Sequence, residues 1–187
     1  MRQCACSPRA SNDLETTKST DMHREDRTFA GVRVVREVSA NMDDVVAKLR
    51  ARMGRLTIAA VIDIAQKARS ADDFESDARQ FIPESGFVIF DEIDHGAWLQ
   101  IYGLGLKSLR WIFGNPIIAV TMTRHDATAG LFVPLELLFT ENPNGEGCAI
   151  TYVVPSSLIA IGDNPSLLAA AKRLDEKLEA LMVSALG

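Results

Sequence analysis

Apolar and polar residues alternate, or apolar residues run together, in five short stretches of the chain. Successive side chains of a β-strand point to opposite faces of its sheet, so a period of two predicts a half-buried strand. Strands are therefore predicted over residues 31–38, 87–93, 109–113, 133–139 and 148–154. The sequence Asn-Pro-Asn-Gly between the last two carries residues that tight turns prefer, and it predicts a hairpin there.

Apolar residues that recur every three or four positions predict helices between and after these strands. The clearest helix is 164–186, where an Asn-Pro start precedes a stripe of leucines. Asn41 is likewise a predicted N-cap with Asp44 at the third helical position, and Gly54 is expected to stop or kink the helix that follows. Further helices are predicted over 56–69, 72–80 and 95–102, and from Pro116 onward.

These elements predict an α+β fold. The simplest packing is a two-layer sandwich, in which an antiparallel-rich sheet of about five strands is covered on one face by helices. Residues 1–28 are polar and charged and cannot bury enough apolar surface to fold, so they are predicted to be a disordered leader. The rest of the chain, 29–187, is of a size that fits one domain.

Composition narrows the partners that we expect. A net charge of −5 in 187 residues argues against nucleic acid, which requires a basic surface. No apolar run approaches the length of a membrane-spanning helix, and the N-terminus lacks the apolar centre of a secretory signal. The three cysteines, two of them in the predicted leader, form no disulfide framework, so a cytoplasmic location is expected.

Two triplets are the candidates for chemistry: Ile93-Asp94-His95 and Gly114-Asn115-Pro116. Each closes a predicted strand and opens a predicted helix. We therefore expect polar groups from two strand ends to face a common cleft. An imidazole at His95 could exchange protons near neutral pH, and the free amides after Asn115 could bind an anion.

Each candidate also has a purely structural interpretation. His95 could bond a backbone carbonyl or the Asp94 carboxylate at a helix start, and both Asp94 and Asn115 are residues that commonly cap helices. Gly114 could allow a close backbone approach or supply a tight bend. A metal site at His95 would need further ligands, and the spacing of the sequence brings none of them near it. His125 lies in a polar turn, so no metal site is predicted.

Several other side chains have two possible roles. The aromatic residues Trp98, Tyr102, Trp111 and Phe113 could line a pocket for an apolar ligand or could pack between helix and sheet. Asp91 and Glu92 are consecutive in a strand, so they should point to opposite faces, with one of them directed inward. Cys148 is expected to be a small buried residue rather than a nucleophile.

The order of these motifs resembles the DUF302 family of bacteria and archaea. The residues that carry the resemblance are FVIFDEIDHGAWLQIYGLGLKSLRWIFGN at 87–115, Val133-Pro134-Leu135, and Tyr152 with Pro155. It covers about residues 30–162, with the C-terminal helix as a common extension. The resemblance implies a domain with TATA-binding-protein-like architecture, often a homodimer, in a family without an assigned function. A helical segment at about 55–85 is an insertion relative to the usual pattern.

Three hypotheses follow. The first is a dimeric small-molecule binding or sensing domain, whose ligand-binding residues are His95, Asn115, Asp94, Gly114, Trp98 and Tyr152. The second is a structural or interaction module without a ligand, and the third is an enzyme that uses His95 as general acid and base. The sequence leaves any cofactor undetermined.

Overall fold

Six strands form a single sheet in the order β1-β6-β5-β4-β3-β2. The computed structural model describes residues 22–187. Neighbouring strands are antiparallel except for β2, which runs parallel to β3. The strands are β1 (Arg33–Val38), β2 (Gly54–Arg55), β3 (Val88–Asp94), β4 (Ser108–Gly114), β5 (Leu135–Glu141) and β6 (Cys148–Val153). All five predicted strands are confirmed, and the two-residue strand β2 is the addition.

All the predicted helices are present. They are α1 (Met42–Arg50), α2 (Ile58–Lys67), α3 (Ala71–Arg79), α4 (His95–Leu99), α5 (Pro116–Thr123), α6 (Pro155–Ile159) and α7 (Pro165–Leu186), with short 3-10 helices η1 (Gln100–Tyr102) and η2 (Ala127–Phe132). The helix predicted over 95–102 is divided into α4 and η1, and α6 and η2 are additions. Asn41 caps α1 by accepting a hydrogen bond from the Asp44 amide, as its position predicts. Helix α1 ends at Arg50, four residues before its predicted end at Gly54, because Gly54 belongs to strand β2.

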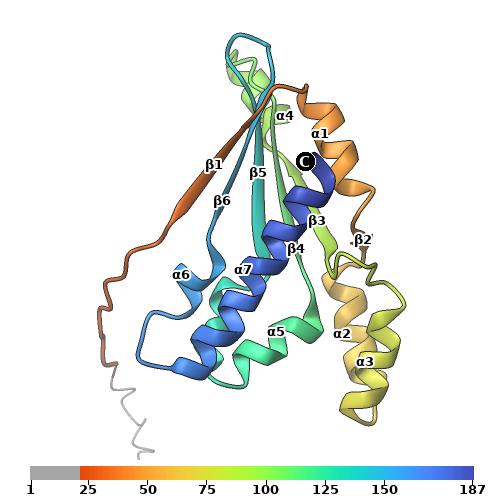
Figure 1. Ribbon diagram of the computed structural model, residues 1–187, viewed down its shortest axis with the longest axis vertical. Coiled ribbons are helices and arrows are strands. Elements are labelled where there is room, and N and C mark those ends of the chain that lie inside the picture. Colours follow the sequence, from red (N-terminus) through yellow and green to blue (C-terminus); the bar gives the residue numbers. More distant parts are fainter. Residues whose placement is uncertain (1–21) are drawn as a thin grey trace, which may run out of the picture.

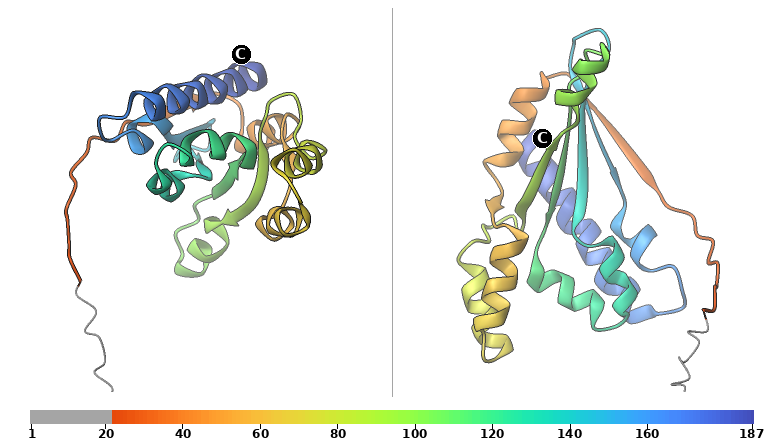
Figure 2. Two further views of the ribbon diagram at one scale, coloured as in Figure 1. Left: turned by 90° about the horizontal axis from the view of Figure 1, so that it is seen from below. Right: turned by 180° about the vertical axis from the view of Figure 1, so that it is seen from behind.

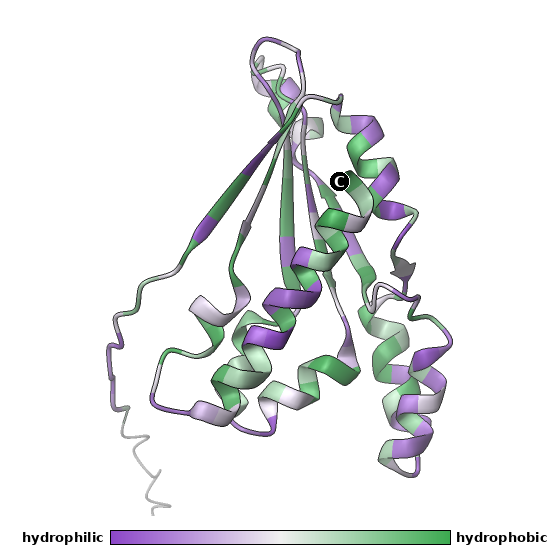
Figure 3. Cartoon of the chain, in the orientation of Figure 1, coloured by the Kyte–Doolittle hydropathy of each residue, from purple (hydrophilic) through white to green (hydrophobic). Residues whose placement is uncertain are grey.

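Helices α1 and α7 cover one face of the sheet, and the other face carries no helical layer (Figures 1 and 2). The long helix α7 crosses the strands and buries a stripe of its apolar side chains, whereas its charged residues lie on the outward side, together with the exposed Leu168 and Val183 (Figure 3). Facing it from the sheet are buried side chains of the four central strands, among them Ile89, Trp111, Phe113, Leu137, Phe139 and Ile150. The fold is therefore the predicted two-layer α+β arrangement, with its core on one side of the sheet only.

The uncovered face of the sheet, here called the open face, mixes apolar and charged side chains. Val35 on β1 is 53% exposed, and Leu138 on β5 is half-buried. Arg110 and Glu136, from adjacent strands, form an ion pair with each other on this face. This mixture differs from the helix-covered face, which is almost wholly apolar.

The predicted leader falls largely outside the described residues. Positions 1–21 are not part of the description, and residues 22–28 form neither helix nor strand and are exposed. Within residues 22–187, no helix is both long enough and apolar enough to span a membrane.

Candidate ligand-binding site

The two triplets lie at opposite ends of the β3–β4 hairpin. Asp94 pairs with Leu109 at one end, and Gly114 pairs with Val88 at the other. Because a strand rises about 3.3 Å per residue, the two ends of these seven-residue strands are separated by roughly 20 Å. The prediction of a common cleft is therefore wrong. Because β3 and β4 are antiparallel neighbours, their C-terminal ends lie at opposite ends of the pair.

Asn115 is a helix cap whose side-chain oxygen and nitrogen both form hydrogen bonds. Its Oδ1 accepts hydrogen bonds from the amides of Ile117, at 2.8 Å, and Ile118, at 3.2 Å. Its Nδ2 donates to the carbonyl of Gly86 at 2.8 Å. Pro116 has no N–H, and the amide of Ala119 donates to the carbonyl of Asn115. The first turn of α5 thus has no free amide, so the capping interpretation holds and the anion site does not.

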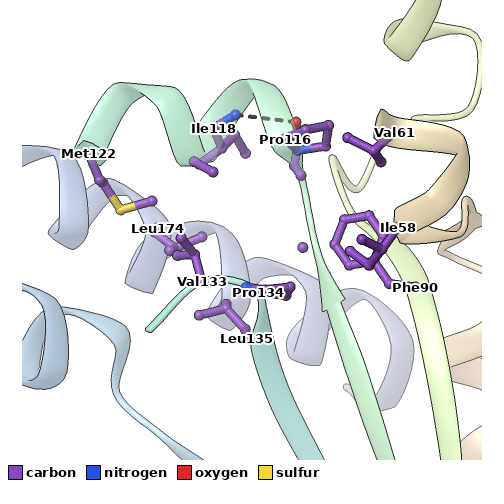
Figure 4. Close-up of a pocket in the computed structure, with 13 residues that line it drawn as sticks. Ile58, Val61, Phe90, Pro116, Ile118, Met122, Val133, Pro134, Leu135 and Leu174 are labelled. Carbon is purple, nitrogen blue, oxygen red and sulfur yellow. Dashed lines mark hydrogen bonds between the residues drawn. The ribbon is translucent and has the colours of Figure 1, made fainter. Parts of the chain in front are cut away.

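Beside this cap lies an apolar cavity of about 160 Å³ (Figure 4). It opens between α2, α5 and the segment that leads into β5. Apart from Asn115, its lining is apolar, and it includes Ile58, Val61, Phe90, Gly114, Pro116, Ile118, Met122 and Pro134. Of the candidate ligand-binding residues, Asn115 and Gly114 reach this cavity.

A local irregularity of β3 helps to form the cavity. The pairing of β3 with β4 shifts between Ile89 and Asp91, so that Phe90 is an extra residue in the strand. A Cβ at Gly114 would lie 3.2 Å from Cε2 of the Phe90 ring, which is a tight contact. The absence of a side chain at Gly114 therefore leaves room for the Phe90 ring beside the cavity. This confirms the interpretation of Gly114 as a site of close approach.

Asp94 and His95 occupy a different environment at the far end of the hairpin. The Asp94 carboxylate caps α4 by accepting a hydrogen bond from the Ala97 amide at 3.1 Å. The half-buried His95 ring packs edge-on against the ring of Trp98, with the two centroids 4.8 Å apart. Asp94, His95 and Trp98 do not line the apolar cavity.

The same end carries a cluster of exposed apolar side chains, which we call the apolar tip. Its members are Trp98, Ile101, Tyr102, Leu104 and Leu106, and Ile101 and Tyr102 are 82% and 80% exposed. The whole stretch 96–106 contains no charged residue. Of the four aromatic residues with two possible roles, Trp111 and Phe113 are fully buried in the core, whereas Trp98 and Tyr102 belong to this tip.

Tyr152 lies at a third location, away from both triplets. Its hydroxyl accepts a hydrogen bond from Nε of Arg36 at 3.1 Å, and Arg36 also pairs with Glu179 of α7. The bond to Tyr152, together with Glu179, raises the pKa of the Arg36 guanidinium. Tyr152 therefore helps to join β1, β6 and α7 and takes no part in the apolar cavity.

The most connected ionic group is Glu92 in the middle of β3. It accepts a hydrogen bond from the indole N–H of the buried Trp111 at 3.0 Å and pairs with both Arg50 and Arg55. Burial alone would raise the pKa of Glu92, but the hydrogen bonds from Arg55 and Arg50 outweigh it and the pKa is lowered. Glu92 is thus the inward member of the Asp91–Glu92 pair. Through its ion pairs with Arg50 and Arg55 it links α1 and β2 to β3.

Other potentially reactive groups in the described residues are not assembled into a site. Cys148 is buried as predicted, and burial raises the pKa of its thiol. The Asp126 carboxylate accepts hydrogen bonds from the amide and hydroxyl of Thr128, so it caps η2 beside the polar turn at His125. Within residues 22–187 no three His, Cys, Asp or Glu side chains gather closely enough to hold a metal ion.

The fold and this cavity define a two-layer α+β domain with an apolar recess at one end of its sheet. The family model described as "Domain of unknown function DUF302" matches residues 66–185, and the chain belongs to this family. The matched range begins within α2 and extends through most of α7, so it starts later and ends later than the range of about 30–162 over which the resemblance was predicted.

A solved structure supports the fold. The crystal structure of an uncharacterized conserved DUF302 protein from Bacillus stearothermophilus aligns with a TM-score of 0.57 and 17% sequence identity. The alignment covers 82% of this chain and 97% of the other. No curated protein matches the chain.

Proposed function

We propose that this protein binds a small apolar or aromatic molecule in the cavity between α2 and α5, and that it acts as a homodimer. The observation that carries the proposal is the half-enclosed cavity of about 160 Å³ with an almost wholly apolar lining. Native interiors are close-packed, with few voids larger than a water molecule. A recess of this size and composition is the kind of feature that small-molecule sites have.

The chemistry of the lining restricts the ligand. The oxygen of the Asn115 carboxamide accepts two backbone amides and its nitrogen donates to Gly86, so it can offer a ligand one N–H at most and no charged group. An ionised ligand placed here would lose its hydration without gaining a partner of opposite charge, at a cost of several kcal/mol. Engineered apolar cavities of about 150 Å³ bind benzene. The expected ligand is therefore uncharged and about the size of one aromatic ring.

Helix α2 gives the cavity a wall outside the central sheet. Ile58 and Val61 project from α2 toward Phe90 and the start of α5 (Figure 4). Ile58 remains 45% exposed, which places it at the mouth of the recess. The helical segment of about residues 55–85, predicted as an insertion, thus contributes one wall of the proposed site.

The proposal is tested by titrating the full chain with toluene and indole, followed by thermal shift and by NMR. We expect both probes to raise Tm and to move resonances of Ile58, Val61 and Met122. Ala119→Leu, which fills the cavity, should weaken binding at least tenfold. The matched control is Val120→Leu on the next, 43% exposed position of α5, which should bind as the wild type does. Equal binding by both variants, or none by the wild type, would overturn the proposal.

A structural or interaction module without a ligand is the second candidate. It is favoured by the full use of Asn115 and Asp94 as caps and by the exposed apolar tip. It predicts that no apolar probe raises Tm.

The third hypothesis, an enzyme that uses His95 as general acid and base, loses support. Asn115, the candidate for holding an anionic substrate, lies at the opposite end of the sheet from His95. The proposed location is the cytoplasm, where the free thiol of Cys148 would remain reduced.

A further inference from the structure

We propose that two copies pack through their open faces in antiparallel orientation, so that the apolar tip of each copy covers the mouth of the cavity in the other. The cavity would then be a composite site, completed by the partner. This inference rests on the proposed function for the role of the cavity, but the arrangement of the two copies is argued independently, from the tip, the open face and the hairpin that joins them.

The apolar tip is the first observation. Five large apolar side chains are between 44% and 82% exposed within a stretch of nine residues, 98–106. Aromatic side chains alone cover about 150–250 Å² each, so the tip exposes apolar surface on the order of 500 Å². The largest apolar patch of a typical monomer is about 300–600 Å² and is often functional, so a patch of this size is a candidate interaction site. We therefore expect the tip to bind an apolar surface of another molecule.

The direction in which the tip projects is the second observation. Seen along the strands, α4 lies on the side of the sheet away from α7 (Figure 2, left). The same side is the open face, on which the strands are uncovered (Figure 2, right). A molecule that packs on the open face would consequently also meet the apolar tip, which overhangs one end of it.

The position of the cavity is the third observation. Phe113 points into the core, so its neighbour Gly114 faces the other side of the sheet, where Phe90 and Pro134 lie nearest to it. Met122 and Leu174 of the core also line the cavity, so it extends from the helix-covered side past the end of the sheet and reaches the open face beside Gly114, at the end of β3–β4 opposite the tip. A two-fold axis across the middle of the hairpin exchanges its two ends. It brings the tip of each copy to the cavity of the other, which makes two equivalent apolar contacts.

The surface between tip and cavity is suited to such packing. Ile93, Ile112 and Leu138 are half-buried apolar side chains on the open face. Arg110 and Glu136 in its centre already pair with each other, so burying them leaves no isolated charge. The exposed Asp91, opposite Ile112 on the same face, must keep its contact with solvent in such an interface. Standard interfaces bury about 800 Å² on each partner, more than the tip alone supplies. A stable dimer therefore needs the open face in addition to the tip, and a second copy offers both surfaces at once.

The assembly is tested on the full chain by sedimentation velocity and light scattering. We expect the wild type to be a dimer and Ile101→Asp to be a monomer with unchanged circular dichroism. The control is Val183→Asp, which places the same charge on a 59% exposed apolar residue of α7, in the helix layer away from the open face. This variant should remain dimeric. A monomeric wild type, or a dimer that survives Ile101→Asp, overturns the proposal.

Disulfide trapping tests the orientation. In a background with Cys4→Ser and Cys6→Ser, Ile101→Cys protein is mixed with Ile58→Cys protein and oxidised. Linked heterodimers are expected from the mixture, and none from either variant alone. Linkage of Ile101→Cys to itself would mean that the tips pack against each other, and would overturn the antiparallel arrangement.

The failure of this inference can be told apart from that of the proposed function. If toluene binds the wild type at least five times more tightly than monomeric Ile101→Asp, the partner completes the cavity. If both bind equally, the composite site is wrong while the binding function stands. If neither binds but the disulfide-trapped dimer forms, the antiparallel dimer stands, and both the binding function and the composite site are wrong.

Discussion

The two ends of the β3–β4 hairpin carry the same local pattern and have opposite surroundings. At both ends a strand closes, a side chain caps the next helix, and apolar residues follow. At the Asn115 end the helix packs beside the core and leaves a small apolar cavity, whereas at the Asp94 end the short helix exposes its apolar side chains to solvent. The comparison teaches that a strand-cap-helix pattern fixes local geometry, while the surroundings depend on which elements cover that end.

The largest expected difference between the ends concerns their aromatic residues. Phe113→Ala removes a fully buried ring near the Asn115 end and should cost about 3–5 kcal/mol of unfolding free energy. Trp98→Ala at the other end should cost less than about 1 kcal/mol, because the residue is 44% exposed. Urea denaturation of both substitutions in the Ile101→Asp background, in which the proposed contact between copies is absent, measures this contrast. Similar losses would mean that the tip is packed within one chain.

The caps should differ in the same direction. Asn115→Ala removes the acceptor for two amides and the donor to Gly86, in a half-buried place, and should cost about 2 kcal/mol. Asp94→Ala removes one bond at an exposed helix and should cost about 1 kcal/mol or less. Asn115→Asp separates the two roles, since it keeps the acceptor and loses the donor. Equal losses for the two alanine variants would contradict the assignment.

The middle of the hairpin gives a pH-dependent comparison. The pKa of Glu92 is lowered in the folded protein, so its stabilising contribution is complete above the ordinary pKa of glutamate. That contribution is lost as the pH falls through the lowered value. Glu92→Gln should therefore cost about 2 kcal/mol at pH 7 and progressively less below about pH 4. Urea unfolding at several pH values measures this loss of unfolding free energy. The control is Asp91→Asn, a substitution at the exposed neighbouring residue. A loss independent of pH would contradict the ion-pair explanation.

The smallest effect is expected for His95. Its ring contacts Trp98 at a partly exposed position, and the loss of that aromatic pair should cost about 0.5–1 kcal/mol in His95→Ala. In the monomeric Ile101→Asp background, where no partner covers the cavity, binding of toluene or indole at the other end of the sheet should be unchanged. A loss of probe binding at unchanged stability would show that His95 belongs to the site after all.

Much of the fold could be predicted because its signals are local. Asn41, Asp94, Asn115 and Asn164 each precede an apolar helical pattern, and each accepts a backbone hydrogen bond as an N-cap. The alternation in β5 and β6 likewise follows from the side chains themselves. Such features depend on residues only a few positions apart, so one sequence is enough to identify them.

The shared cleft could not be predicted in the same way. A connection of a dozen or more residues is long enough for a parallel crossover, while an antiparallel pair can have one of any length. Residues 95–107 between β3 and β4 therefore allowed both arrangements. The parallel one would have put His95 and Asn115 at the same edge. Likewise, Trp98 and Trp111 sit in similar apolar runs, and only the absence of a covering element at the tip separates them.

The edges of the sheet bear on how large an assembly can become. On one edge, β1 carries the charged residues Arg33, Arg36 and Glu37 among its six. The other edge ends in β2, which offers only Gly54 and Arg55 and is followed directly by α2. Charged or very short edge strands are poor templates for adding another strand. Copies of this chain are therefore protected against open-ended, fibre-like growth of the sheet, and association through one face stops when that face is filled.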